Sequence, residues 1–218
     1  PPERDTTRWH NWDGFCAISY SGVPRESYDR YISKEGLDEH FAALKAAGFH
    51  TITPDDAADF LAGRAPLPEN ALLILFEGGR KDSFIAATPL LRKHGFVATY
   101  GVPTGLTERW GSFYVRSGDI GKLADMDHWT IASMGHEAYG TVPVDAAGKK
   151  KGFLTHQKWL GDRTEDQHEV RTRITNDYAR AAAIIAREAA RPAAAYIAPY
   201  QFGGPWRAAD EPALRAEL

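Results

Sequence analysis

The feature that most constrains the fold is segment 71–79, which reads Ala-Leu-Leu-Ile-Leu-Phe-Glu-Gly-Gly. Six consecutive apolar residues leave no polar face, so a strand built from them must be covered on both sides. The run ends abruptly in an acid and two glycines, which favour a turn. The segment therefore predicts a buried strand whose C-terminal end delivers the carboxylate of Glu77 into a cleft.

Other short apolar segments alternate with segments of helical periodicity. The expected strands are 15–21, 50–53, 72–76, 96–102, 129–133 and 194–198. The expected helices cover about 37–47, a stretch from Pro54, 83–94, 120–125 and 164–190. Such alternation is typical of α/β folds with a parallel sheet, so we expect a (β/α) barrel-like fold, as an incomplete barrel or an open sheet. Ligands then bind at the C-terminal strand ends, and 112–119 and 141–161 are expected to be surface loops near them.

The composition fits one domain and argues against several functions. A chain of 218 residues that is 43% hydrophobic can bury one core, so we expect a single domain over 1–218, as part of a longer protein. The net charge of −3 argues against nucleic-acid binding. No apolar run is long enough to span a bilayer, and no signal peptide is seen. Cys16 is the only cysteine, which excludes an intrachain disulfide and a CxxC metal site.

Aromatic side chains at the expected strand ends and loops suggest a carbohydrate site, since sugar rings stack on aromatic faces. The candidates are Tyr20, Trp110, Tyr139, Tyr200 and Trp206. For any one of them alone, packing in the core or in a loop is the favoured interpretation. Tyr200 is the strongest candidate, because it follows Pro199 at the end of an expected strand.

Three segments carry a family resemblance. Segment 44–79 ends in Phe-Glu-Gly-Gly, segment 128–140 contains Ala-Ser-Met-Gly-His-Glu-Ala, and segment 171–201 ends in Ala-Pro-Tyr-Gln. Together they resemble the TFDDG strand, the HSxxH-type motif and the WPYG strand end of the NodB-homology polysaccharide deacetylases. The branch they resemble most removes N-acetyl groups from poly-β-1,6-N-acetylglucosamine in biofilms. The resemblance covers most of the chain.

The resemblance implies a metal site that this sequence has altered. In that family a divalent metal, usually zinc, nickel or cobalt, polarises the acetamide carbonyl and activates water. The base position of the motif is Glu77 here, and the three ligand positions are Gly78, Met134 and Ala138. The resemblance therefore implies a degenerate deacetylase-like domain that binds an amino-sugar polymer without a cofactor. Glu77 is then the one candidate catalytic residue.

Two other functions stay open. One is an active carbohydrate hydrolase or deacetylase with a rebuilt zinc site, in which Glu77 is the base and His136 and Glu137 are ligands or acid partners. Further candidates for that site are Asp127, His128 and His156. The other is a structural or partner-interaction module, in which Glu77 caps the following helix or pairs with Arg80.

The resemblance also implies partners and a location. The ligand is an amino-sugar polymer, with His136 joining the aromatic candidates Tyr20, Trp110, Tyr139 and Tyr200 as binding residues. A C-terminal glycoside hydrolase domain or other exopolysaccharide machinery is the expected protein partner. The expected location is extracellular or periplasmic.

Overall fold

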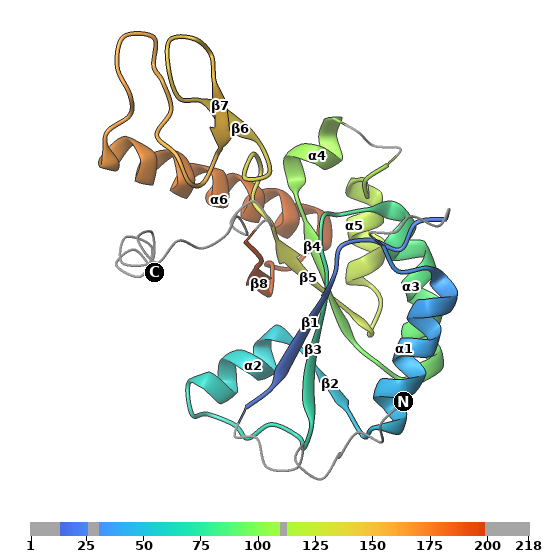
Figure 1. The fold of residues 1–218 in the computed structure, drawn as a ribbon. Helices are drawn as coiled ribbons and strands as arrows, with labels where there is room; N and C mark the ends of the chain where they lie inside the picture. The colour runs from blue at the N-terminus through green and yellow to red at the C-terminus, as the bar shows by residue number, and fades with distance from the viewer. Residues whose placement is uncertain (1–13, 26–30, 110–112, 199–218) are drawn as a thin grey trace, which may run out of the picture.

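The computed structural model describes residues 14–25, 31–109 and 113–198. Figure 1 shows a twisted sheet flanked by helices, with an arm that projects from one end beside the longest helix. We define the arm as residues 141–166. Within the described residues, no helix combines the length and the hydropathy needed to cross a bilayer.

Six strands form the sheet, and every pairing in it is parallel. They are β1 (Cys16–Tyr20), β2 (His50–Ile52), β3 (Ala71–Phe76), β4 (Ala98–Val102), β5 (Trp129–Ser133) and β8 (Ala195–Tyr196), in the order β1-β3-β4-β5-β8. Leu72 of β3 is paired with both β1 and β2, so these two strands lie on opposite edges of β3. Strand β4 shares the second edge with β2, opposite Leu75 and Phe76. The described sheet is half of a (β/α) barrel, which confirms the predicted fold class.

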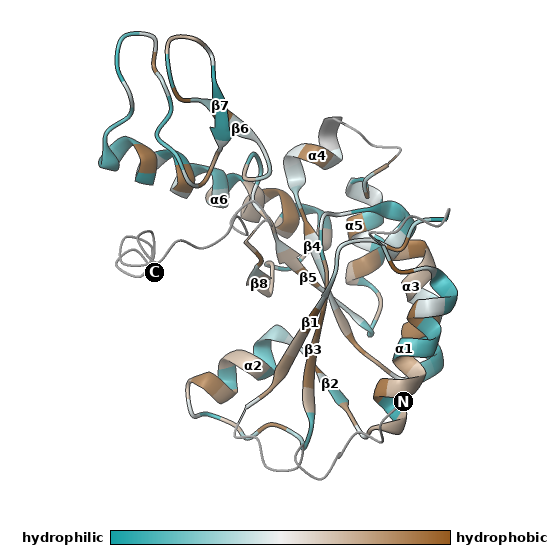
Figure 2. Ribbon diagram, viewed as in Figure 1, coloured by the Kyte–Doolittle hydropathy of each residue, from teal (hydrophilic) through white to brown (hydrophobic). Residues whose placement is uncertain are grey.

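The core lies on one face of this sheet, under α1 (Lys34–Ala46), α3 (Lys81–His94) and α5 (Ser117–Ala124). Alternate residues of β3, namely Leu72, Ile74 and Phe76, have no exposed surface and pack into that core. Leu73 faces the other way, where a smaller cluster joins it to α2 (Pro54–Leu61). Figure 2 shows the apolar strands at the centre and polar outer faces on α1 and α3.

Local sequence signals explain where several helices begin and end. The Ser33 hydroxyl accepts a hydrogen bond from the Gly36 N–H at the start of α1. Reciprocal side-chain and backbone bonds open α2 and also α6 (Gln167–Ala189), where Asp166 pairs with the third helical residue. Helix α3 ends at Gly95, whose φ of 68° lies in the left-handed region that favours glycine.

Most expected elements are present, but the two expected loops were partly wrong. Helix α5 begins at Ser117, inside the first of them. The second contains β6 (Thr141–Pro143) and β7 (Lys150–Gly152), which pair as an antiparallel hairpin. The short helix α4 (Thr104–Arg109) was not predicted either. Three-residue strands and a six-residue helix are too short to show a periodicity, so contacts elsewhere in the chain determine them.

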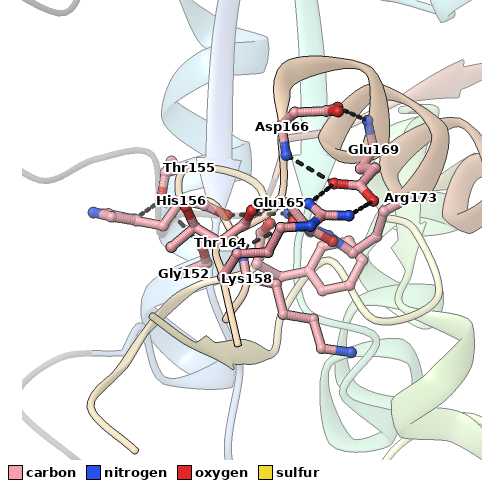
Figure 3. A network of polar contacts seen from close by, with 11 residues as sticks. Gly152, Thr155, His156, Lys158, Thr164, Glu165, Asp166, Glu169 and Arg173 are labelled. Atoms are coloured by element: carbon pink, nitrogen blue, oxygen red, sulfur yellow. Dashed lines mark hydrogen bonds and ion pairs between the residues drawn. The ribbon is translucent and has the colours of Figure 1, made fainter. Parts of the chain in front are cut away.

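The arm is attached to α6 through the guanidinium of Arg173 (Figure 3). Its Nη1 donates to the Phe153 carbonyl at 2.5 Å, and its Nη2 donates to the His156 carbonyl at 3.1 Å. The same group binds the Glu165 carboxylate at 2.8 Å, and the guanidinium lies 4.5 Å from the centre of the Phe153 ring. Burial raises the pKa of Glu165, but the hydrogen bonds from Arg173 and from the Lys158 N–H outweigh it, so the pKa lies below its usual value. The pair stays ionised and fastens the arm.

We predict that Arg173→Ala lowers the free energy of unfolding by about 3–5 kcal/mol, because it leaves the buried Glu165 carboxylate without its partner. The two side chains are only 13% and 6% exposed. Urea unfolding measures the change. The matched control is Arg163→Ala, since the ion pair of Arg163 with Glu169 is 53% and 33% exposed and its loss should cost about 0–1 kcal/mol. Equal effects of the two variants would contradict an anchoring role for Arg173.

Candidate functional site

Glu77 lies at the C-terminal end of β3, directly beyond the last paired residue. Its N–H donates to the Tyr20 carbonyl at 3.0 Å, which extends the β1–β3 pairing by one residue. Its half-buried carboxylate accepts a hydrogen bond from the Ser19 hydroxyl. Because Ser19 is opposite Leu75, this contact is on the sheet face that points away from the core.

The two structural roles expected for Glu77 were wrong. Arg80 pairs with Asp82 instead, with its Nη2 2.5 Å from a carboxylate oxygen. Helix α3 starts after Arg80 without a side-chain cap. The physical reason is proximity, because Asp82 is only two residues from Arg80 and also accepts from the Ser83 N–H. Among the described residues, the Glu77 carboxylate is thus held by a neutral hydroxyl rather than by a cation.

Met134 reaches across the sheet to the residue after Glu77. It follows β5 and is fully buried, and its sulfur accepts a hydrogen bond from the Gly78 N–H at 3.2 Å. Strand β4 lies between β5 and β3, and Gly101 of that strand leaves the path open. A Cβ atom at Gly101 would lie 2.6 Å from the Met134 sulfur. Gly101 therefore provides the room in which the Met134 sulfur lies next to the Gly78 N–H.

Tyr139 contacts the same glycine from another direction. Its hydroxyl lies 3.6 Å from the place that a Cβ atom at Gly78 would take. Among the described residues, apart from the two chain neighbours of Gly78, no other side chain comes within 4 Å of that place. Ala138, at the position that the resemblance gave to a ligand, is buried and lies against Gly135 instead. The structure thus brings Tyr139, rather than Ala138, to Gly78.

The turn that follows Met134 is held from two helices. The Asp177 carboxylate of α6 accepts from the N–H groups of His136 and Glu137 at 2.9 and 2.6 Å. At the start of α4, the N–H groups of Thr104 and Gly105 donate to the Gly135 and His136 carbonyls, each at 3.0 Å. Sequence reasoning missed Asp177, which is 7% exposed. Its position four residues before the buried Ala181 was an available signal, because an acid on an apolar helix stripe requires a partner.

His136 is part of this turn and only 4% exposed. Its Nδ1 shares a hydrogen bond with the Thr104 hydroxyl at 3.0 Å, and its Nε2 lies 3.7 Å from a Glu137 carboxylate oxygen. A zinc ion requires three or four such donors. Across 14–25, 31–109 and 113–198, no three His, Cys, Asp or Glu side chains are grouped as a metal site would need.

The donors present do not fit the divalent metal that the resemblance implies. Gly78 has no side chain, and the Met134 thioether is a soft ligand that is poorly suited to zinc, nickel or cobalt beside oxygen donors. The further candidates Asp127 and His128 precede β5, at the opposite end of the sheet from Glu77, so their assignment to this site was wrong. His156 lies in the arm, where its ring nitrogen bonds the Thr155 hydroxyl.

The structure places the aromatic candidates in different surroundings. Tyr20 is 7% exposed and stacks on Phe76 with 5.1 Å between ring centres, while its hydroxyl bonds His40. Burial raises the pKa of the Tyr20 hydroxyl. This ring belongs to the core, which leaves it little surface for a ligand. Tyr139 is half-buried beside Gly78. Trp110, Tyr200 and Trp206 lie outside the described residues.

We predict that Asp177→Ala lowers the free energy of unfolding by about 2–3 kcal/mol, because two backbone N–H groups lose a charged acceptor. Glu39→Ala is the matched control, since it removes the same charge from an exposed position on α1. Chemical denaturation measures both variants. Hydrogen exchange should speed up at His136 and Glu137 in the first variant only. Unchanged exchange there would contradict the role given to Asp177.

We also predict that Gly101→Ala destabilises the fold by about 1–3 kcal/mol, because the new methyl group overlaps the Met134 sulfur. Met134→Ala removes the overlap, so the two substitutions together should cost less than the sum of the single ones. A double-mutant cycle from urea unfolding gives the coupling. Purely additive effects would show that the two side chains do not compete for one space.

Sequence comparison relates part of the chain to carbohydrate deacetylases, although no protein-family model matches it. The chain is 28% identical over 123 residues to the poly-β-1,6-N-acetyl-D-glucosamine N-deacetylase of Escherichia coli K12. That match covers 55% of this chain and 18% of the enzyme, so the chain spans less than a fifth of this relative. It is also 32% identical over 68 residues, or 31% of its length, to a Bacillus subtilis protein described as a polysaccharide deacetylase, of which 24% is covered.

Solved structures show the same fold over nearly the whole chain. The de-N-acetylase from Aggregatibacter actinomycetemcomitans superposes with a TM-score of 0.74 at 18% identity, over 94% of this chain and 85% of that one. The deacetylase domain of BpsB from Bordetella bronchiseptica gives 0.73 at 20% identity, over 94% and 86%. IcaB from Ammonifex degensii gives 0.69 at 23% identity, over 94% and 81%. The predicted resemblance is confirmed: this chain is related in sequence to the polysaccharide deacetylases and has the NodB-homology fold.

Proposed function

We propose that this chain is a deacetylase-like domain of exopolysaccharide production that binds an amino-sugar polymer and does not carry out metal-dependent deacetylation. The Escherichia coli K12 relative acts, by its name, on poly-β-1,6-N-acetyl-D-glucosamine. A β-1,6-linked amino-sugar polymer is therefore the ligand we assign. The C-terminal ends of the parallel strands are the place where it binds.

The observation that carries this proposal is the contact of Gly78 with Met134 and Tyr139. The motif positions that hold the metal in the family belong to a glycine and a thioether here. The thioether is itself engaged with the Gly78 N–H, and Gly101 makes room for it. The Met134 sulfur is thus hydrogen-bonded to the backbone and given room by Gly101, which supports a stable and neutral arrangement rather than the loss of one ligand from an otherwise intact site.

The remaining polar groups support binding. The Glu77 carboxylate is half-buried at the strand end, and a carboxylate accepts hydrogen bonds from sugar hydroxyl or amide groups. The turn that carries His136 is fixed by Asp177 and by α4, so little conformational freedom is lost when a ligand binds beside it. Tyr139 adds an aromatic ring next to Gly78.

The same proposal extends to the wider protein. Residues 1–218 form one domain of a longer chain, located in the periplasm or outside the cell. A C-terminal glycoside hydrolase domain or other exopolysaccharide machinery is the partner. The longer chain is supported by the Escherichia coli relative, of which the match covers only 18%, while the location and the partner come from the family resemblance alone.

We predict that titration of the wild-type domain with zinc gives no tight one-to-one binding, while β-1,6-linked N-acetylglucosamine oligosaccharides bind without release of acetate. Two triple variants provide the gain-of-function control. Gly78→Asp with Met134→His and Tyr139→His should bind zinc, because those three positions meet at Gly78. The same variant with Ala138→His in place of Tyr139→His should not, because Ala138 lies against Gly135. Calorimetry and an acetate assay measure these outcomes.

Zinc-dependent acetate release by the wild-type domain would overturn the proposal. If that release disappeared in Glu77→Gln, the domain would be an active deacetylase with a rebuilt site. A wild-type domain that bound neither zinc nor oligosaccharide would instead be a structural or partner-interaction module.

A further inference from the structure

Arg80, three residues beyond Glu77 in the sequence, belongs to a group of side chains outside the deacetylase motifs. Two aromatic rings, Tyr31 and Phe113, lie against one guanidinium, that of Arg80. The Arg80 Cζ atom is 5.0 Å from the centre of the Tyr31 ring and 4.2 Å from the centre of the Phe113 ring. The rings remain 37% and 45% exposed, whereas the guanidinium side chain is only 12% exposed. We call these three residues the aromatic rim.

The aromatic rim is rigid because its central cation is fixed. Asp82 binds Nη2 and Nε of Arg80 at 2.5 and 3.1 Å, and the Arg80 carbonyl accepts from the Tyr100 hydroxyl at 2.6 Å. The Phe113 backbone is fixed as well, since its carbonyl accepts from the Lys81 N–H at 2.9 Å. The ring of Tyr114 braces Phe113 edge-on, with 4.9 Å between ring centres. Arg80 and Phe113 are thus held in place before any ligand arrives, and the Tyr31 ring lies against the fixed guanidinium.

The aromatic rim lies at the same end of the sheet as the strand-end site. Arg80 is three residues from Glu77, and the Gly79 carbonyl accepts from the Val115 N–H at 2.9 Å, which brings the segment of Phe113 to the end of β3. Gly22, just beyond β1, makes room on the other side. A Cβ atom there would lie 2.8 Å from Tyr31 and 3.0 Å from the Arg80 guanidinium.

We propose that the aromatic rim is a saccharide subsite that stacks one neutral pyranose ring of the bound polymer next to Glu77. This inference rests on the proposed polymer-binding function and adds the residues and the ligand chemistry. Rigid aromatic rings offer a large contact area and lose little conformational entropy on binding. Since Asp82 neutralises Arg80, the subsite has no net charge with which to select an anion. An uncharged N-acetylated sugar ring fits these properties.

Binding of β-1,6-linked N-acetylglucosamine oligosaccharides tests the subsite, measured by calorimetry on the full chain. Tyr31→Ala and Phe113→Ala should each weaken binding about fivefold, the typical contribution of one aromatic contact. Tyr31→Phe and Phe113→Tyr keep a ring at each position and should bind as the wild type does. Gly22→Ala should also weaken binding, because its methyl group displaces Tyr31 without removing a ring.

Leu61→Ala is the control for loss of exposed apolar surface, because Leu61 is 74% exposed at the end of α2, which leads to the N-terminal end of β3 and thus lies at the opposite end of the sheet from Glu77. It should leave the affinity unchanged. Urea unfolding of each variant establishes that the protein under test is folded. If the wild type binds the oligosaccharides and the alanine and Gly22→Ala variants bind equally well, the subsite is wrong while the proposed function stands. If the wild type binds none of them, the proposed function fails and the subsite fails with it.

Discussion

The pairing of β3 with three other strands is the constraint on which the rest of the structure depends. Strand β1 takes one edge of it, and β2 and β4 share the other. Its residues Leu72, Ile74 and Phe76 are fully buried, so a shift of one residue would move them to the opposite face. Removing these three side chains from the core would cost free energy, and this cost fixes the register. The register in turn fixes where Glu77 and Gly78 emerge, and hence the position of the site.

At the candidate site, the side chains of Met134 and Tyr139, which lie next to Gly78, are uncharged. A metal centre requires several acidic and imidazole groups close together, and such groups are costly to bury without the ion. In this chain Met134 is buried between two glycines, Gly78 and Gly101, and Tyr139 covers the first of them. Glu77 retains a carboxylate there, held by the Ser19 hydroxyl.

Helix α6 connects the site to the arm. Arg173 and Asp177 are four residues apart, so they lie on the same face of the helix. The first binds Phe153, His156 and Glu165 of the arm, while the second binds the turn that carries His136. Both are buried polar groups whose hydrogen bonds are made to segments far from the helix in sequence. Asp177 therefore holds the turn that carries His136, and Arg173 holds the arm.

The sequence by itself determined the strand 72–76 and the helix–strand alternation, because each depends on residue type or on local periodicity. The structure alone decided that Tyr139 and not Ala138 reaches Gly78, that Tyr20 is a core residue, and that Arg80 pairs with Asp82. It also decided the hairpin of β6 and β7 and the aromatic rim around Arg80. These features join residues that are distant in the chain, or choose among close alternatives by side-chain direction. Such choices depend on packing in three dimensions, which no local pattern encodes.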